Sequence, residues 1–160
     1  MPESTTADEP VAERIVLFAV DALALIQTEN GYRHDVLVMR GDPNGVARGN
    51  GSAGNLIVVR VGQVLVANDV APITKDGYRM VLFVDFTVAR SADAETPSET
   101  LMNRLDADVR RCLCRNFQFG GLAFNSTLQA TQPGQDGSLP TLTIPVEVLF
   151  WTKRDDPFVP

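Results

Sequence analysis

The chain has 160 residues, 44% hydrophobic and 21% charged, a composition typical of one globular domain with a substantial core. Its 20 acidic residues outnumber its 14 lysines and arginines, which argues against a surface built to bind nucleic acid. No apolar run is long enough to span a bilayer, and the polar start MPESTTADEP is unlike a signal peptide, so we expect a protein that stays in the cytoplasm in which it is made.

A flexible acidic tail is predicted for residues 1–10, followed by an amphipathic helix. From Val11 to about Glu29, apolar residues recur at spacings of three and four, which is the helical period. Asn30-Gly31 would end this helix in the left-handed conformation. Leu17 falls on the polar stripe of the helix, so it is either a scattered exposed leucine or part of a contact with a partner.

Three strands are predicted next. Residues 35–40 form a short strand, 55–68 form a β-branched strand with a kink at Gly62, and 78–90 alternate between apolar and mixed positions. The stretch 41–55 between the first two strands is rich in Gly and Asn. We interpret it as a long hairpin connection, and loops of this length are more often functional than shorter ones.

The second helix has a strong start signal. In Thr96-Pro97-Ser98-Glu99, Thr96 can act as N-cap, Pro97 as the first helical residue, and Glu99 as the partner that closes a capping box. The helix continues to about Phe117 with one apolar face. Its polar side is expected to carry Asn103, Arg104, Asp106, Asp108, Arg110, Arg111 and Arg115.

Two further strands, 125–131 and 141–151, complete the predicted sheet. Pro145 cannot donate to a strand ladder, so we expect the last strand to be an edge strand or to carry a bulge there. Residues 153–160 have no regular pattern and read as a C-terminal tail. The order of elements predicts one α+β domain, 11–152, with a mainly antiparallel sheet of about four to five strands and two helices packed on one face.

Two short motifs resemble binding sites, and their context argues against both. Gly49, Gly51 and Gly54 have the spacing of a dinucleotide-binding loop, but a strand follows them, whereas the phosphates need a helix N-terminus. Arg40-Gly41-Asp42 is the tripeptide that integrins read. It occurs by chance in many proteins, and a cytoplasmic chain does not meet an integrin.

Catalytic chemistry has no support in the sequence. His34 is the single histidine, so a histidine pair cannot form and a nucleophilic triad lacks a convincing base. Cys112 and Cys114 lie on different faces of a helix, where they cannot share a metal, and we expect reduced thiols of which one is in the core. The sequence therefore predicts no enzyme and no catalytic, cofactor-binding or metal site.

The order of segments resembles the tail-terminator, or minor tail, proteins of long-tailed bacteriophages, over roughly residues 11–158. The matching segments are ERIVLFAVDALALI before GYRHDVLVMRG, then VLFVDFTVAR, TPSETLMNRLDADVRRCL, FGGLAF and TLTIPVEVLFWTKRDDPF. The resemblance implies a small virion subunit, assembled in the host cytoplasm, that forms a homohexameric ring at the head-proximal end of the tail tube. Such a ring ends tube growth and provides the surface for head-tail joining.

The resemblance also implies the partners. These are further copies of the chain, the tail-tube protein and a head-completion or neck protein, with DNA passing through unbound and no membrane contact. A neck connector, a tail-tube subunit and a small-molecule-binding α+β domain are the alternatives. The arginines of the second helix are either a solvated face or a contact surface. The candidate interface residues are Leu17, Arg40, Asp42, Arg48, Asn50, Arg110, Arg111 and Arg115.

Overall fold

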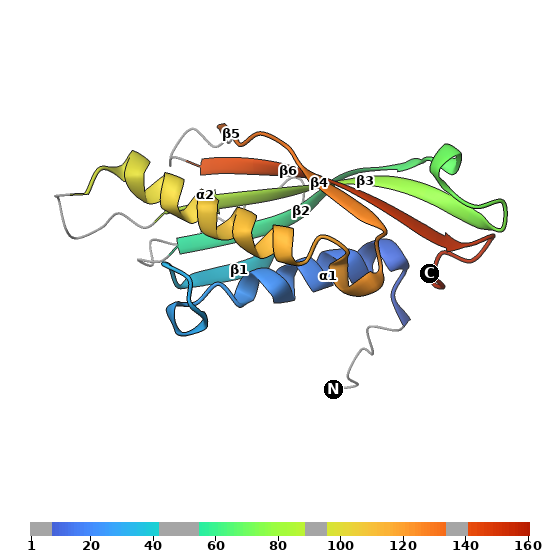
Figure 1. Ribbon diagram of the computed structural model, residues 1–160, viewed down its shortest axis with the longest axis horizontal. Coiled ribbons are helices and arrows are strands. Elements are labelled where there is room, and N and C mark those ends of the chain that lie inside the picture. The colour runs from blue at the N-terminus through green and yellow to red at the C-terminus, as the bar shows by residue number, and fades with distance from the viewer. Residues whose placement is uncertain (1–7, 42–54, 89–95, 134–140) are drawn as a thin grey trace.

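The protein is an α+β fold in which two helices cover one face of a six-stranded sheet (Figure 1). The computed structural model describes residues 8–41, 55–88, 96–133 and 141–160. The helices are α1 (Val11–Ala24) and α2 (Ser98–Arg115), with short 3-10 turns η2 (Thr28–Asn30), η3 (Asn68–Val70) and η4 (Phe119–Gly121). The strands are β1 (Val36–Arg40), β2 (Asn55–Val66), β3 (Lys75–Thr87), β4 (Asn125–Leu128), β5 (Gln132–Pro133) and β6 (Thr141–Lys153). The predicted fold class is confirmed.

The sheet is mixed because its first pair is parallel. The spatial order is β1-β2-β3-β6-β4, with β5 also on β6. β1 runs parallel to β2, with Val36 opposite Asn55, and every other pair is antiparallel. Parallel neighbours are joined by a crossover and not by a hairpin. The interpretation of 41–55 as a hairpin connection is therefore wrong. Residues 42–54, including the three glycines of the loop motif, lie outside the described residues, and β2 begins directly after them.

The last strand lies inside the sheet, so the edge position expected from Pro145 is wrong, whereas the irregularity expected as the alternative is present in the ladder on its β4–β5 side. β6 pairs with β3 along its whole length and with β4 and β5 on its other side. The backbone N–H of Gln129 donates to the Pro145 carbonyl at 2.9 Å. The N and O of one strand residue point to the same side, so the proline nitrogen faces the segment between β4 and β5, where the ladder is interrupted. An internal strand thus accepts the proline.

The kink predicted at Gly62 is confirmed as an irregularity in the β2–β3 ladder. The register shifts between Val61 and Gln63, so Gly62 is the extra residue of a bulge. A Cβ at Gly62 would lie 2.1 Å from Cε2 of Phe83. Only glycine fits at this position, since any side chain would overlap the aromatic ring on the neighbouring strand.

The first helix ends earlier than its periodicity predicts, at Ala24 instead of about Glu29. Gln27 is already extended, with φ −137° and ψ 148°. Its side-chain Nε2 donates to the carbonyls of Ala24 and Val36, at 3.2 and 3.0 Å, so it links the helix end to β1. Gly31 has φ +81°, as expected for a left-handed cap, but it ends the turn η2 and not the helix.

The second helix begins without the predicted capping box. Pro97 has a non-helical ψ of 140° and occupies the N-cap position, and no side chain caps the helix. Its carbonyl accepts the backbone N–H of Thr100 at 3.0 Å. The proline therefore precedes the first helical residue, because its extended ψ sets the direction in which the chain enters the helix.

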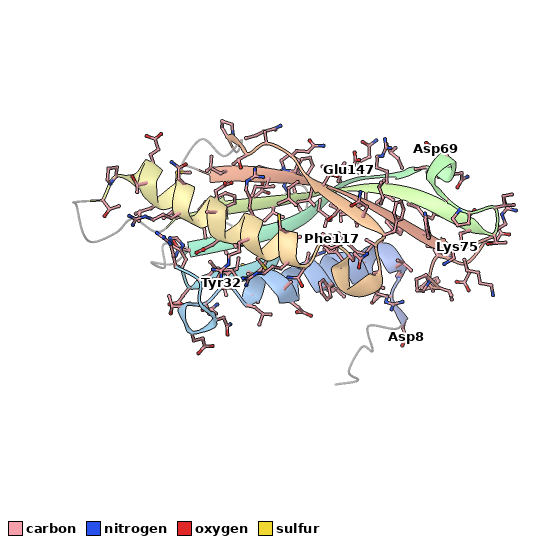
Figure 2. The ribbon with its side chains drawn as sticks, in the orientation of Figure 1. Asp8, Tyr32, Asp69, Lys75, Phe117 and Glu147 are labelled. Carbon is pink, nitrogen blue, oxygen red and sulfur yellow. The ribbon has the colours of Figure 1, made fainter. Side chains whose placement is uncertain are left out.

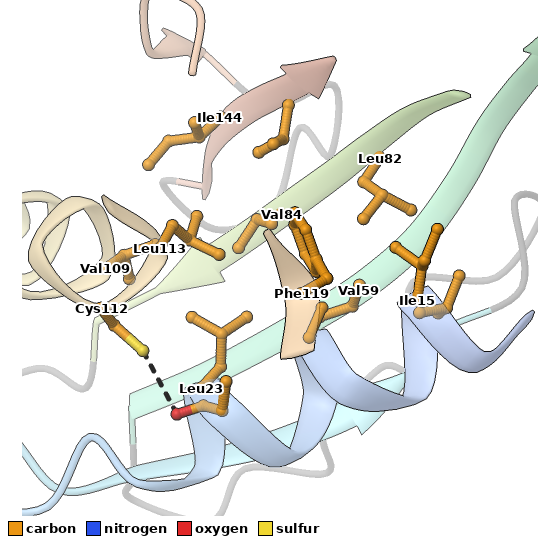
Figure 3. Close-up of a cluster of buried hydrophobic side chains, with 14 of the residues drawn as sticks. Ile15, Leu23, Val59, Leu82, Val84, Val109, Cys112, Leu113, Phe119 and Ile144 are labelled. Atoms are coloured by element: carbon orange, nitrogen blue, oxygen red, sulfur yellow. Dashed lines mark hydrogen bonds between the residues drawn. The ribbon is translucent and has the colours of Figure 1, made fainter. Parts of the chain in front are cut away.

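The core fills the space between the helices and the sheet (Figure 3). As the alternation predicts, Met80, Leu82, Val84 and Phe86 of β3 face this layer and are at most 1% exposed. Cys112 is also buried, and its Sγ donates to the carbonyl of Ala22 at 3.2 Å, linking α2 to α1. Cys114 is exposed, so one thiol of the two belongs to the core, as expected.

The last residues fold back onto the start of the domain. The backbone N–H of Lys153 donates to the carbonyl of Val159 at 2.6 Å, and that of Val11 donates to the carbonyl of Pro157 at 2.9 Å. Residues 153–160, expected as a tail without regular pattern, thus hydrogen-bond the end of β6 and the first turn of α1. The Val11 N–H is one of the donors that a helix N-terminus leaves unpaired.

Candidate functional site

The β2–β3 pair extends past the helices as an exposed apolar hairpin, which forms one end of the molecule in Figure 1. We call residues 63–78 the distal hairpin. Its exposed side chains include Val64, Leu65, Val66 and Ile73, with 43, 46, 70 and 87% of their surface accessible. Asp69 and Lys75 mark the same end in Figure 2. Adjacent exposed apolar side chains on a soluble domain mark an interaction surface.

One side of the distal hairpin is also an open strand edge. β1 reaches only Val59 of β2, and Gly41 adds one hydrogen bond to the Val59 carbonyl at 2.8 Å. Among the described residues, no strand pairs with β2 beyond Val59 on that side. An edge of this kind presents backbone donors and acceptors to another chain.

The sheet face that the helices leave uncovered contains a paired charge. Asp85 is 4% exposed. It accepts a hydrogen bond from Nε of Arg60 at 2.5 Å and another from the Thr143 hydroxyl. The Arg60 guanidinium lies 4.3 Å from the ring centre of Phe83. The sequence places Asp85 on the side of β3 away from the core, which is correct, but its burial depends on neighbouring strands. A buried carboxylate with these partners stabilises the fold.

A second surface with functional potential is a cleft of about 430 Å³ along α2, which we call the arginine cleft. It is lined by Arg33, Thr100, Asn103, Arg104, Asp108 and Arg111. All but Arg33 belong to one stripe of α2, because their spacings of three and four residues place them on one helix face. That spacing was present in the sequence and could have identified the stripe, whereas the contribution of Arg33 could not be foreseen.

Arg33 lies at the cleft because the loop before β1 is hydrogen-bonded to α2. Oδ2 of Asp108 accepts from the Arg33 backbone N–H at 2.9 Å and from Nδ1 of His34 at 2.8 Å. From the other side, the Arg111 guanidinium donates to the Gly31 carbonyl at 3.0 Å. The sequence predicts Asp108 on the polar side of the helix, and the structure buries it under this loop, with 5% of its surface exposed. The single histidine thus has a structural partner.

Arg110, Arg111 and Arg115, which the sequence predicts as one group, lie in three different environments. Arg110 is half-buried and donates to Asp106 at 3.1 Å, to the Gln129 carbonyl at 2.9 Å and to the Thr131 hydroxyl at 2.7 Å. It therefore holds the segment after β4 against α2. Arg111 lines the cleft, and Arg115 is exposed near the end of the helix.

Of the other predicted interface residues, the structure describes Leu17 and Arg40. Leu17 is half-buried on α1. Arg40 pairs with Glu13 at 3.2 Å, which joins the end of β1 to the first turn of α1. Asp42, Arg48 and Asn50 lie outside the described residues.

Two titratable groups near the cleft are shifted by burial. Burial is the largest cause that raises the pKa of the Cys112 thiol. It is also the largest cause that raises the pKa of the Tyr32 hydroxyl, which contacts this thiol. The Tyr32 ring lies beneath the Arg111 guanidinium, 5.2 Å away, at the position labelled in Figure 2. A thiol kept protonated in this way is a poor nucleophile, so Cys112 acts as a core residue.

Some kinds of site are absent from the part of the chain that the structure describes. Within residues 8–41, 55–88, 96–133 and 141–160, no group of three His, Cys, Asp or Glu side chains is arranged to hold a metal ion. In the same ranges, no helix is both long and apolar enough to cross a membrane. No protein-family model and no curated protein sequence matches this chain.

Proposed function

We propose that this chain is a structural virion protein that caps the tail tube of a long-tailed bacteriophage as a ring. In the resembled family the ring has six members, ends tube growth and provides the surface to which the head docks. The partners are then other copies of the chain, the tail-tube protein and a head-completion protein. The sequence resemblance supports this function, and the distal hairpin adds independent support for self-assembly.

The observation that carries the proposal is the open edge of β2 beside exposed apolar side chains. β2 has 12 residues and β1 has 5, so the distal part of β2 has a free edge in the described chain. Leu65 and Val66 stand next to that edge and are 46 and 70% exposed. A neighbouring subunit that covers this surface removes apolar area from water and satisfies the backbone groups.

Ring closure requires two different surfaces on each subunit, because head-to-tail contacts repeat around a cyclic axis. The sheet has two different ends that meet this requirement. One is the open edge of the distal hairpin. The other is β4, which has 4 residues and, among the described strands, pairs only with β6. We propose that the distal hairpin of one copy packs against the β4 side of the next.

The mass of the purified particle tests this proposal. We expect the wild-type chain to elute at six times the subunit mass in light scattering. Leu65→Glu should yield monomers with an unchanged melting temperature, since the site is already half in water. Leu25→Glu is the matched control, because Leu25 is 60% exposed at the end of α1, and it should keep the ring.

Two results would contradict self-assembly through this surface. One is a wild-type chain that stays monomeric at every concentration. The other is a Leu65→Glu variant that keeps the wild-type mass. A ring disrupted equally by Leu65→Glu and Leu25→Glu would move the interface to the α1 side of the molecule.

A further inference from the structure

The arginine cleft is distinct from the surface used for ring formation, and its chemistry indicates a ligand. We propose that it binds a small phosphate-bearing molecule, with the phosphate held by the guanidinium groups of Arg33, Arg104 and Arg111. These three side chains all line the same cleft of about 430 Å³. That volume lies in the range of sites for small ligands, which extends from roughly 300 to 1,000 Å³.

The net formal charge of the cleft lining is positive, because three guanidinium groups stand beside one carboxylate. Asp108 is 5% exposed. Its Oδ2 accepts from the Arg33 backbone and from His34, at 2.9 and 2.8 Å. These hydrogen bonds fix the carboxylate under the loop, and its single negative charge is outnumbered by the three guanidinium charges of the lining. Three guanidinium groups therefore dominate the field inside the cleft.

Part of the cleft is preorganised, and part is free to bind. The Arg111 guanidinium is fixed by the Gly31 carbonyl at 3.0 Å and by the Tyr32 ring beneath it. The Arg33 backbone is fixed by Asp108. Within the described ranges, the guanidinium groups of Arg33 and Arg104 have no hydrogen-bond or ion-pair partner. Their N–H donors are thus available to an anion. The contacts of Arg111 and of the Arg33 backbone hold the cleft in shape before the anion binds, which lowers the cost of binding.

The arrangement favours phosphate over a carboxylate or a nucleic-acid backbone. Arg33 reaches the cleft from a loop, and Arg104 and Arg111 reach it from positions two helical turns apart on α2. A planar carboxylate, by contrast, is satisfied by one guanidinium fork. Phosphate has three or more acceptor oxygens that point in different directions, and the side chains of Thr100 and Asn103 add donors. Duplex DNA is disfavoured because the whole chain carries a net charge of −6.

Titration calorimetry with sodium pyrophosphate at constant ionic strength tests the site. We expect saturable heat with a dissociation constant below about 1 mM. Arg104→Ala should weaken binding by about tenfold or more, and Arg104→Lys by less, because lysine keeps the charge and loses the fork. The side chain of Arg104 is exposed and has no partner among the residues that the structure describes, so the melting temperature of both variants should equal that of the wild type.

Arg154→Ala is the matched control, because it removes the same charge from an exposed position after β6. It should bind pyrophosphate like the wild type. The proposal is overturned if the wild type gives no saturable heat, or if Arg104→Ala and Arg154→Ala weaken binding equally. If citrate binds as tightly as pyrophosphate, the cleft is a general anion site that does not select phosphate. Tighter binding of duplex DNA, lost in Arg104→Ala, would reassign the cleft to nucleic acid. Because the titration is independent of particle mass, its result stands whether or not a ring forms.

Discussion

The two halves of the β2–β3 pair are both rich in apolar residues and have opposite surroundings. In the half beneath the helices, Val59, Leu82 and Val84 are fully buried. In the distal hairpin, Leu65 and Val66 are 46 and 70% exposed. The strands and their pairing continue from one half to the other, so the difference arises from the helices, which cover only the first half (Figure 1). Apolar residues in the covered half stabilise the domain, and those in the uncovered half are available to a partner.

The sharpest test of this comparison is the same substitution in each half. Leu82→Ala removes a fully buried side chain and should lower the free energy of unfolding by about 2–5 kcal/mol, because a cavity remains. Leu65→Ala should lower it by less than about 1 kcal/mol. Urea denaturation of the wild type and both variants, at a dilution at which light scattering shows monomers, measures both values. Equal losses would show that the distal hairpin is part of the folding core.

A second test uses polar pairs on the uncovered face of the sheet. Asp85→Ala leaves Arg60 and Thr143 without their buried partner and should lower the free energy of unfolding by about 1–3 kcal/mol. This is less than for a fully buried ion pair, because the Arg60 side chain is 26% exposed. The control is Glu147→Ala, whose partner Arg79 is 3.8 Å away and 43% exposed. Its cost should be below about 0.5 kcal/mol. A similar cost for both would mean that burial of the Arg60–Asp85 pair contributes nothing.

A third test follows stability with pH. Burial raises the pKa of the Cys112 thiol above its ordinary value of 9.0, so the unfolded chain loses this proton first. The contribution of the buried, protonated thiol to the free energy of unfolding is complete below about pH 9. It is lost as pH rises through the folded pKa, by at most about 1.4 kcal/mol per pH unit. Cys112→Ala should remove this part of the alkaline loss in urea titrations, and Cys114→Ala should keep it. An identical alkaline profile in Cys112→Ala would contradict the shift.

The smallest effect is expected at the surface pair of Arg40 and Glu13. The two side chains are 35 and 33% exposed and 3.2 Å apart. Arg40→Ala should lower the free energy of unfolding by no more than about 0.5 kcal/mol, and the loss should shrink at high salt. A loss above about 1 kcal/mol in thermal unfolding would show that this pair fixes β1 to α1, and the covered half would then depend on its surface as well as its core.

The sequence by itself determined features that a few neighbouring residues encode. The alternation along β3, the kink at Gly62 and the left-handed Gly31 follow from periodicity and from the freedom of glycine, and the structure confirms each. The polar stripe of α2 that lines the arginine cleft is also encoded, at spacings of three and four.

Only the tertiary structure decided which segments meet. The parallel pairing of β1 with β2, the internal position of β6 despite Pro145, and the burial of Asp108 under the loop of Arg33 and His34 all join residues distant in sequence. Local periodicity records which face of an element is apolar, and it contains no information on which element covers that face. The same limit explains the distal hairpin. Its apolar residues have the sequence pattern of core residues, and they are exposed because the helices do not extend over them.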